Sequence, residues 1–338
     1  MSAGIRVNED GSKATIVVVD EGAWHNLTTP VPGPISMEEG LRLAHLDGLD
    51  YHLEPTFVPV GDADKGEKVE FIRVKDTYTT VARHPFTREW ESIGGSVTDK
   101  YVMHTIEDVA EFGTAITENG ASLSALGMID EGRRMFASFK VRDYDWFGDK
   151  SFAWLNFYTD FTGGMSTIGK PGATRVVCRN TFHVGLAEQV QLQFRARHTG
   201  RVLIDRVAEA KQALGIAESA LDEFEVEVRR LIDTDVDEQK FKKIVERFVP
   251  ITDALSVGAR MRREEQRDQI TSVWKHGTAK NISGTAWGAY NALTEYVDWT
   301  GGSYRTDEAR FVASLTPGSL MDKQRDRALL VVKEVARA

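Results

Sequence analysis

The stretch that decides the fold lies in the middle of the chain, at Ala173–His183, and reads Ala-Thr-Arg-Val-Val-Cys-Arg-Asn-Thr-Phe-His. Its apolar run predicts a buried strand over 175–178. The polar pair Asn180 and Thr181 predicts a sharp turn, and a short helix is expected to follow it. We expect the neighbouring segments to pack around this strand and turn.

The same region is a basic island in an acidic protein. Between Lys170 and Lys211 there are eight lysines and arginines but only three acids, whereas the whole chain of 338 residues has a net charge of −9. The remainder therefore sums to about −14. The basic residues are Lys170, Arg175, Arg179, Arg195, Arg197, Arg201, Arg206 and Lys211. This local excess of positive charge indicates an anionic partner, but it does not name a reaction.

The segments before the island predict an antiparallel sheet. Apolar and alternating residues mark strands over 122–129, 135–141 and 152–158, and a helix is expected to start at 105–108. Together with the strand at 175–178, this order predicts an α+β fold in which an antiparallel β-meander is flanked by helices. The chain after the island reads as mainly helical.

Three regions follow from these patterns. Residues 1–13 are expected to be a flexible N-terminus, residues 14–214 an α+β core with a basic centre, and residues 215–338 an acidic, mainly helical C-terminal region. Between positions 215 and 240 there are nine acids and only three bases, so the basic centre and the acidic helices differ sharply in charge.

Composition excludes several classes of protein. An apolar content of 41% is enough for a large buried core. No run of 18 apolar residues is present, so no membrane span is expected. The first residues lack the apolar segment of a signal peptide, which favours a cytoplasmic location. The single cysteine, Cys178, excludes an intrachain disulfide and reads first as a buried strand residue.

Five arginines of the island could line a groove that follows a phosphate backbone, with each contact releasing counterions. They are Arg175, Arg179, Arg195, Arg197 and Arg201. The alternative is a solvated charged face, or arginines that are paired with the acidic C-terminal helices. Both interpretations remain open at this point.

Four side chains on the predicted meander could form a stacking platform for unpaired bases. Trp154 and Tyr158 fall on the same side of one strand, and Lys140 and Arg142 on the same side of its neighbour. Aromatic faces beside a basic groove are typical of proteins that bind single strands. The alternative is that this face packs under a helix as part of the core.

The turn at Asn180 and Thr181 has two interpretations as well. A side-chain oxygen there would cap the following helix. Alternatively, the free N–H groups of that helix would receive a phosphate, with help from Arg175 and Arg179. The two roles compete for the same N–H groups.

A metal site is a weaker hypothesis. Asp143, Asp145, Asp149 and Asp160 could place carboxylates for Mg²⁺, as two-metal nucleases require. The acids at 143–149 lie beside a glycine, where acids commonly form turns. We therefore expect no cofactor, with Mg²⁺ at Asp160 as the remaining candidate.

Five segments carry a resemblance to a known family. They are Ala23-Trp-His25, Gly48-Leu-Asp-Tyr51, Arg175-Val-Val-Cys-Arg-Asn-Thr-Phe182, Arg197-His-Thr199 and 284–298. In this order, over roughly residues 22 to 335, they resemble the domain-of-unknown-function 932 family of phage- and plasmid-encoded proteins. The resemblance implies a gene product of a mobile element that works in a bacterial cytoplasm. It implies no settled activity.

One departure from the family pattern matters. Where the family usually has an Asn-Ser-His-Asp-Gly-Ser-like turn, this chain has Phe157-Tyr-Thr-Asp-Phe-Thr-Gly-Gly164. Only Asp160 and a nearby glycine remain, so a role that rests on the missing histidine is not carried over.

The hypothesis that follows is a phage-encoded protein that binds single-stranded nucleic acid. It would be a DNA recombination or annealing protein that acts as a homo-oligomer in the cytoplasm of the host bacterium. One alternative is a non-enzymatic interaction or assembly protein that works through its acidic helices. The other is a metal-dependent phosphodiester enzyme. We expect binding rather than catalysis.

Overall fold

The computed structural model of the protein describes residues 5–9, 14–19, 31–61, 65, 68–146, 149–175, 181–183, 194–198, 206–278, 280–301, 310, 313 and 318–336. No helix among these residues is both long and apolar enough to cross a membrane.

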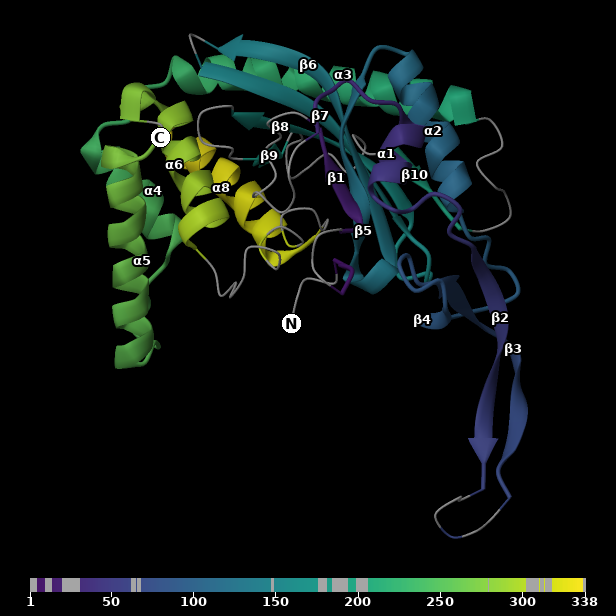
Figure 1. The fold of residues 1–338 in the computed structure, drawn as a ribbon. Helices are drawn as coiled ribbons and strands as arrows, with labels where there is room; N and C mark the ends of the chain where they lie inside the picture. Colours follow the sequence, from purple (N-terminus) through teal and green to yellow (C-terminus); the bar gives the residue numbers. More distant parts are fainter. Residues whose placement is uncertain are drawn as a thin grey trace.

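An antiparallel sheet that has seven strands within the described residues forms the centre of the molecule (Figure 1). The strands are β1 (Ile16–Val18), β5 (Ser122–Ile129), β6 (Arg134–Trp146), β7 (Asp149–Asp160), β8 (Thr167–Arg175), β9 (Thr181–His183) and β10 (Phe194–Ala196). Their order is β1-β5-β6-β7-β8-β10, and β9 also pairs with β8. Strands β5, β6, β7 and β8 follow one another in the chain and pair in the same order in the sheet. The predicted α+β fold with an antiparallel meander is therefore confirmed.

Most of the helices follow the sheet in the chain. The longer ones are α1 (Met37–Leu43), α2 (Ile106–Glu118), α3 (Arg206–Ile232), α4 (Glu238–Phe248), α5 (Val257–His276), α6 (Ala286–Glu295) and α8 (Leu320–Ala336). Helix α2 begins at a reciprocal capping box, in which Thr105 accepts a hydrogen bond from the Asp108 N–H and Asp108 accepts one from the Thr105 N–H. The mainly helical C-terminal part is also confirmed.

Helices cover both faces of the sheet. On one face, α1, α2 and the start of α3 enclose a core that includes Phe112, Phe139 and Phe157. Helix α8 reaches the other face, where Asp322 Oδ1 lies 3.0 Å from Lys170 Nζ of β8. The strands are therefore buried on both faces, unlike an antiparallel sheet with one side in water.

Helix α3 spans the boundary expected at residues 214 and 215. Its Ala213 and Leu214 belong to the core over the meander. Its Leu221 and Phe224 belong to a second core, which α4, α5, α6 and α8 complete. One long helix thus connects the sheet to the C-terminal helices, and Figure 1 shows it running along the top of the molecule.

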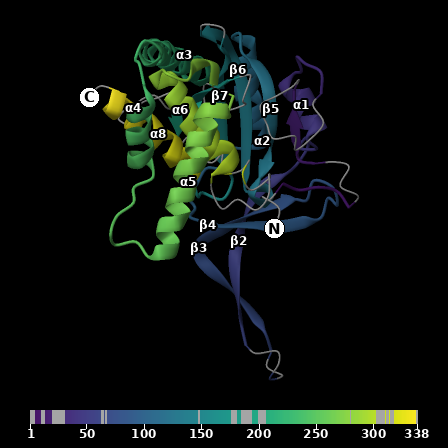
Figure 2. The same cartoon turned by 90° about the vertical axis from the view of Figure 1, so that its left-hand side faces the viewer.

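A second, smaller sheet projects from the body. It consists of β2 (Tyr51–Val60), β3 (Glu70–Arg83) and β4 (Trp90–Val97), in that order. Its base is fixed to the main sheet, because Tyr51 donates a hydrogen bond of 3.0 Å to the Gly132 carbonyl and Thr80 donates one of 2.7 Å to the Phe161 carbonyl. The distal halves of β2 and β3 extend into solvent as a two-stranded arm (Figures 1 and 2).

Candidate nucleic-acid interface

The structure places Arg175 and Arg195, two of the five arginines that were expected to share a groove, at opposite ends of β8. Arg195 lies in β10 opposite Ile168, near the start of β8, whereas Arg175 is the last residue of β8. Seven residues of strand separate them, or roughly 23 Å. Arg197 is exposed just after β10. Arg179 and Arg201 lie outside the described residues.

A strand, and not the start of the predicted helix, occupies Thr181–His183, and the rest of the span in which that helix was expected, residues 184–193, lies outside the described residues. Thr181 begins strand β9, where it pairs with Thr174 of β8. The backbone groups of Thr181–His183 therefore take part in a strand ladder, so Thr181 does not cap a helix or offer free helical N–H groups to a phosphate. Asn180 lies outside the described residues.

The predicted aromatic platform is part of the protein interior. Trp154 is 3% exposed and Tyr158 is 6% exposed, so neither ring offers a free face to a base. Burial also raises the pKa of the Tyr158 hydroxyl. The platform hypothesis was therefore wrong. The alternation of side chains along the strand correctly placed both rings on one side of β7, but it could not show that the rest of the protein buries this side.

The two cations expected beside that platform lie on opposite faces of the sheet. The register of β6 against β7 shifts between Lys140 and Arg142, and such a bulge turns the following side chains to the other face. Lys140 Nζ lies 2.7 Å from Asp143 Oδ1 and 4.1 Å from the Phe152 ring centroid. Arg142 Nη1 lies 2.7 Å from Asp222 Oδ1 on α3. Both charges are already paired within the protein.

Asp160 holds a turn together and is not a free metal ligand. Its Oδ1 accepts hydrogen bonds from the Thr162 N–H at 2.8 Å and from the Gly164 N–H at 3.2 Å, and its Oδ2 lies 3.0 Å from Arg134 Nε. Asp149 begins β7, eleven residues or about 36 Å from Asp160. Asp143 and Asp145 of β6 pair with Phe152 and Lys150, which are eight and ten residues, or about 26 and 33 Å, from Asp160. No cluster of three potential ligands occurs among the described residues.

A hollow of about 430 Å³ lies on the outer face of the small sheet, around Trp90. Trp90 is 46% exposed, which is unusual for so large an apolar side chain. The His52 ring meets it edge-on at 4.8 Å between centroids. The Arg83 guanidinium carbon lies 4.2 Å from its centroid. Two neighbours therefore hold the indole in place, while almost half of the residue stays open.

The rim of this hollow is polar. Glu54 Oε1 lies 3.0 Å from His52 Nε2, and Ser92 and Glu91 complete the lining. Carboxylate and hydroxyl oxygens accept hydrogen bonds, so the rim suits a flat ring that carries amino groups at its edge.

A second hollow of about 430 Å³ lies beyond the other end of β4. Its lining includes two exposed cations, Lys100 and Arg197, and no acidic residue. Neither cation forms an ion pair with a described residue. Gly163 and Ser166 line the wall between them. Two unpaired cations beside small residues suit a phosphate group.

Stacked rings form the floor of this second hollow. The His198 ring lies 5.1 Å from the Tyr101 centroid and 4.3 Å from the His104 centroid. His198 Nδ1 lies 3.1 Å from the Val102 carbonyl, to which it must donate because a carbonyl only accepts. Burial lowers the pKa of His198.

Sequence reasoning identified Arg197 but missed Lys100, Trp90, Arg83 and His52. Trp90 stands between two glutamates in the segment Glu89-Trp-Glu91, which carries no sign of whether the ring is covered. A predicted strand over residues 90–97 would have placed Trp90 and Ser92 on the same face of a small sheet.

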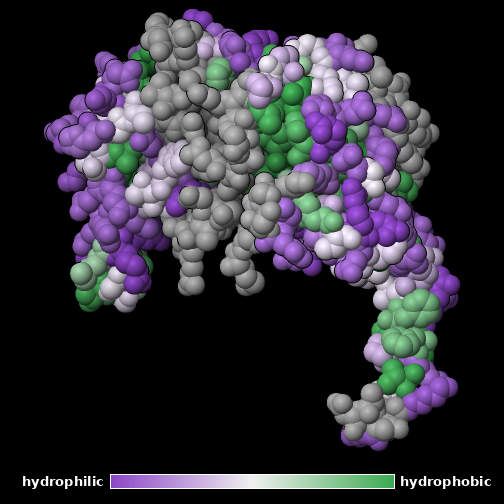
Figure 3. All heavy atoms as spheres, in the orientation of Figure 1, coloured by the Kyte–Doolittle hydropathy of each residue, from purple (hydrophilic) through white to green (hydrophobic). Residues whose placement is uncertain are grey.

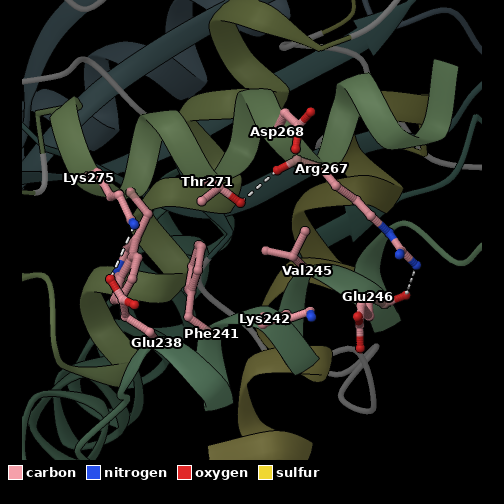
Figure 4. A pocket seen from close by; sticks show the side chains of 10 residues that line it. Glu238, Phe241, Lys242, Val245, Glu246, Arg267, Asp268, Thr271 and Lys275 are labelled. Carbon is pink, nitrogen blue, oxygen red and sulfur yellow. Dashed lines mark hydrogen bonds and ion pairs between the residues drawn. The ribbon is translucent and has the colours of Figure 1, made fainter. Parts of the chain in front are cut away.

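A third hollow lies between α4 and α5 (Figure 4). Phe241 and Trp274 stack in it at 4.1 Å between centroids. Its strongest charges are already satisfied, because Lys275 pairs with Glu238 at 3.2 Å and Arg267 donates to carbonyls at the end of α4. This groove therefore reads as a packed helix–helix seam and is the weaker candidate.

Comparison with known proteins assigns the family. The family model described as Domain of unknown function (DUF932) matches residues 94–316, a range that contains Lys100 and Arg197. Searches of the curated proteins and of the solved structures each found no match. Since the family model covers more than half of the 338 residues, the chain belongs to the DUF932 family.

Proposed function

We propose that this protein binds single-stranded nucleic acid without cleaving it. The single observation that carries the proposal is the half-exposed indole of Trp90, which contacts Arg83 and His52 and lies beside an open hollow. A base stacked on an exposed aromatic ring contributes about 1–3 kcal/mol to binding, and this contribution does not depend on a particular base sequence. Unpaired bases are the ligands that present a free ring face, since bases within a duplex are already stacked.

Charge assigns the two hollows different parts of the ligand. The Glu54 carboxylate lines the Trp90 hollow and would repel a phosphate. Glu91 also lines it, but its carboxylate is paired with Arg6. Lys100 and Arg197 line the other hollow and would attract one. A strand would therefore turn its bases toward Trp90 and its backbone toward Lys100 and Arg197, at opposite ends of β4.

The net charge of −9 is compatible with this arrangement because, in the described part of the chain, no acidic residue lines the hollow of Lys100 and Arg197. Helix α3 and the start of α4 carry the acidic excess, and they pack against the far end of the meander. Binding would depend on a local cationic patch, so affinity should be modest and fall steeply with salt.

The finer part of the proposal is a phage-encoded recombination or annealing protein that acts as a homo-oligomer in the host cytoplasm. It rests on the family resemblance together with the binding mode. It requires that two strands, or two protein copies, meet on the same assembly.

The experiment is fluorescence anisotropy at low salt with three probes. These are a labelled single strand of about 16 nucleotides, the upper site size of single-strand-binding folds, an abasic strand of equal length, and a duplex. We expect the base-containing strand to bind best. Trp90→Ala should weaken that binding by about 5- to 150-fold, the equivalent of one lost stacking contact, and leave the abasic strand unaffected.

The matched control is Trp299→Ala, because Trp299 is 39% exposed but lies in the C-terminal helical region. Its affinity should equal that of the wild type. No binding at low salt, or equal affinities for the wild type and Trp90→Ala, would overturn the proposal.

A further inference from the structure

The arm formed by the distal parts of β2 and β3 exposes apolar side chains on both of its faces. Its tip region pairs Phe57 with Arg73, Val58 with Ile72 and Pro59 with Phe71. The apolar side chains that are at least 44% exposed are Phe57, Val58, Val60, Phe71 and Ile72. Figure 3 shows green patches on the side of the arm that faces the viewer. Contiguous exposed apolar surface of this kind marks an interaction site.

The arm is also too thin to be stable by itself. A two-stranded hairpin is marginally stable in water, and independent stability needs a third strand or a packed face. The body supplies that support only at the base, because β4 first pairs with β3 at Tyr78. The segment of β3 from Glu70 to Thr77 therefore has a free outer edge within the described structure.

The two edges of the arm differ in their capacity to pair. The outer edge of β2 carries Pro55 and Pro59, which lack an N–H and so interrupt any added strand. The outer edge of β3 carries no proline. An added strand would therefore pair with β3.

We propose that the added strand is β3 of a second copy of this chain. In an antiparallel pair, two opposite residues both point their N–H and C=O groups toward the partner strand, or both point them away. When a strand pairs with its own copy along one edge, one residue must therefore lie opposite its own copy, and the two-fold axis passes between them. An axis at Ile72 places Ile72 against its own copy and Phe71 against Arg73 of the other copy. Aromatic and guanidinium groups attract each other in such a cross-strand pair.

The charge pattern disfavours the neighbouring register. An axis at Arg73 would place two arginines against each other, and like charges directly opposite destabilise a sheet. The regular part of β3 opposite β2 runs from Glu70 to Arg73, because the register shifts beyond it and Asp76 has a φ of +51°. Within this part, the Ile72 register opposes no like charges, whereas the Arg73 register does.

The resulting assembly is a four-stranded sheet with β2 of each copy on the outside. Val58, Ile72 and their two copies form one continuous apolar row across it. The prolines then lie at the two free edges, where they block further growth. A closed pair of chains is expected rather than a filament.

The test is oxidative cross-linking of single-cysteine variants, prepared in a chain with Cys178→Ser. Ile72→Cys should form a disulfide-linked dimer, since the residue lies opposite its own copy, where Cβ atoms are about 4.5–5.5 Å apart. Val58→Cys is the matched control: it lies on the same face with similar exposure, but its copy is three strand spacings away, or about 14 Å. It should remain monomeric on a denaturing gel.

Sedimentation of the untagged wild type gives an independent measurement. We expect a dimer that Ile72→Lys, a change at an exposed position, converts to a folded monomer. A monomeric wild type, equal cross-linking of the Val58→Cys and Ile72→Cys variants, or an Ile72→Lys variant that stays dimeric would each overturn the proposal.

Discussion

Arg325 and Asp298 form an ion pair in the interior of the C-terminal helices. Arg325 Nη2 of α8 lies 2.8 Å from Asp298 Oδ1, and the two side chains are 1% and 3% exposed. Asp298 lies in the π-helical turn that follows α6, so the pair ties this irregular turn to the last helix. The Asp298 carbonyl also accepts a hydrogen bond of 2.8 Å from Arg310.

Removing one partner of this pair should be costly. Arg325→Met removes the guanidinium that lies against the buried Asp298 carboxylate, and a broken buried pair costs about 3–5 kcal/mol. We expect urea denaturation to show a loss of that size in the free energy of unfolding. The control is Arg247→Ala, because Arg247 and Glu334 form an exposed pair that should contribute less than about 1 kcal/mol. Equal losses for the two variants would contradict this account.

Two glycine substitutions should have opposite effects on stability. Gly163 has a φ of +79°, and an added Cβ would lie 2.7 Å from Val97 Cγ1, so Gly163→Ala should destabilise the protein by about 1–3 kcal/mol. Gly215 lies within α3 with open space around it, so Gly215→Ala should stabilise the protein by about 0.5–1 kcal/mol. Thermal unfolding of both variants checks the pair of predictions, and a shift in the same direction for both would refute it.

His198 should make the protein less stable in mild acid. Its folded-state pKa is lowered by burial, so the unfolded chain takes up the proton first. Stability should therefore fall as the pH drops below about 6.5, the ordinary pKa of histidine, and keep falling until the folded-state pKa is reached. His198→Gln cannot titrate. Urea denaturation from pH 7 to pH 5 should show a smaller loss for this variant than for the wild type.

Salt dependence should separate the two hollows. Each phosphate contact on a single strand contributes about 0.7 to the slope of log affinity against log salt concentration. Lys100→Ala and Arg197→Ala should each lower the magnitude of that slope by about this amount. Trp90→Ala should lower the affinity and leave the slope unchanged. Slopes identical to that of the wild type for both cation variants would remove Lys100 and Arg197 from the interface.

The features that could be predicted from the sequence are those set by local patterns. The strand at 122–129 matches β5 in full, because its limits depend on the turn residues around it. The start of α2 was predictable from Thr105 and the residues after it, since the cap uses groups within one turn.

The features that could not be predicted depend on partners far away in the chain. A register shift in β6 places Lys140 and Arg142 on opposite faces, and no single strand shows which residue of its partner it will skip. Trp154 and Trp90 are both strand tryptophans, yet one is 3% and the other 46% exposed. Trp154 is buried because other elements pack over the main sheet. Trp90 is exposed because the described elements leave the outer face of the small sheet open.

Photo-cross-linking tests the central claim most directly. A single strand that carries iodouracil should be irradiated with the wild-type protein at low salt, and the cross-linked peptide identified by mass spectrometry. Stacking on an exposed indole predicts an adduct at Trp90 that is lost in Trp90→Ala and retained in Trp299→Ala. Adducts confined to other residues, or none at all under binding conditions, would contradict the account.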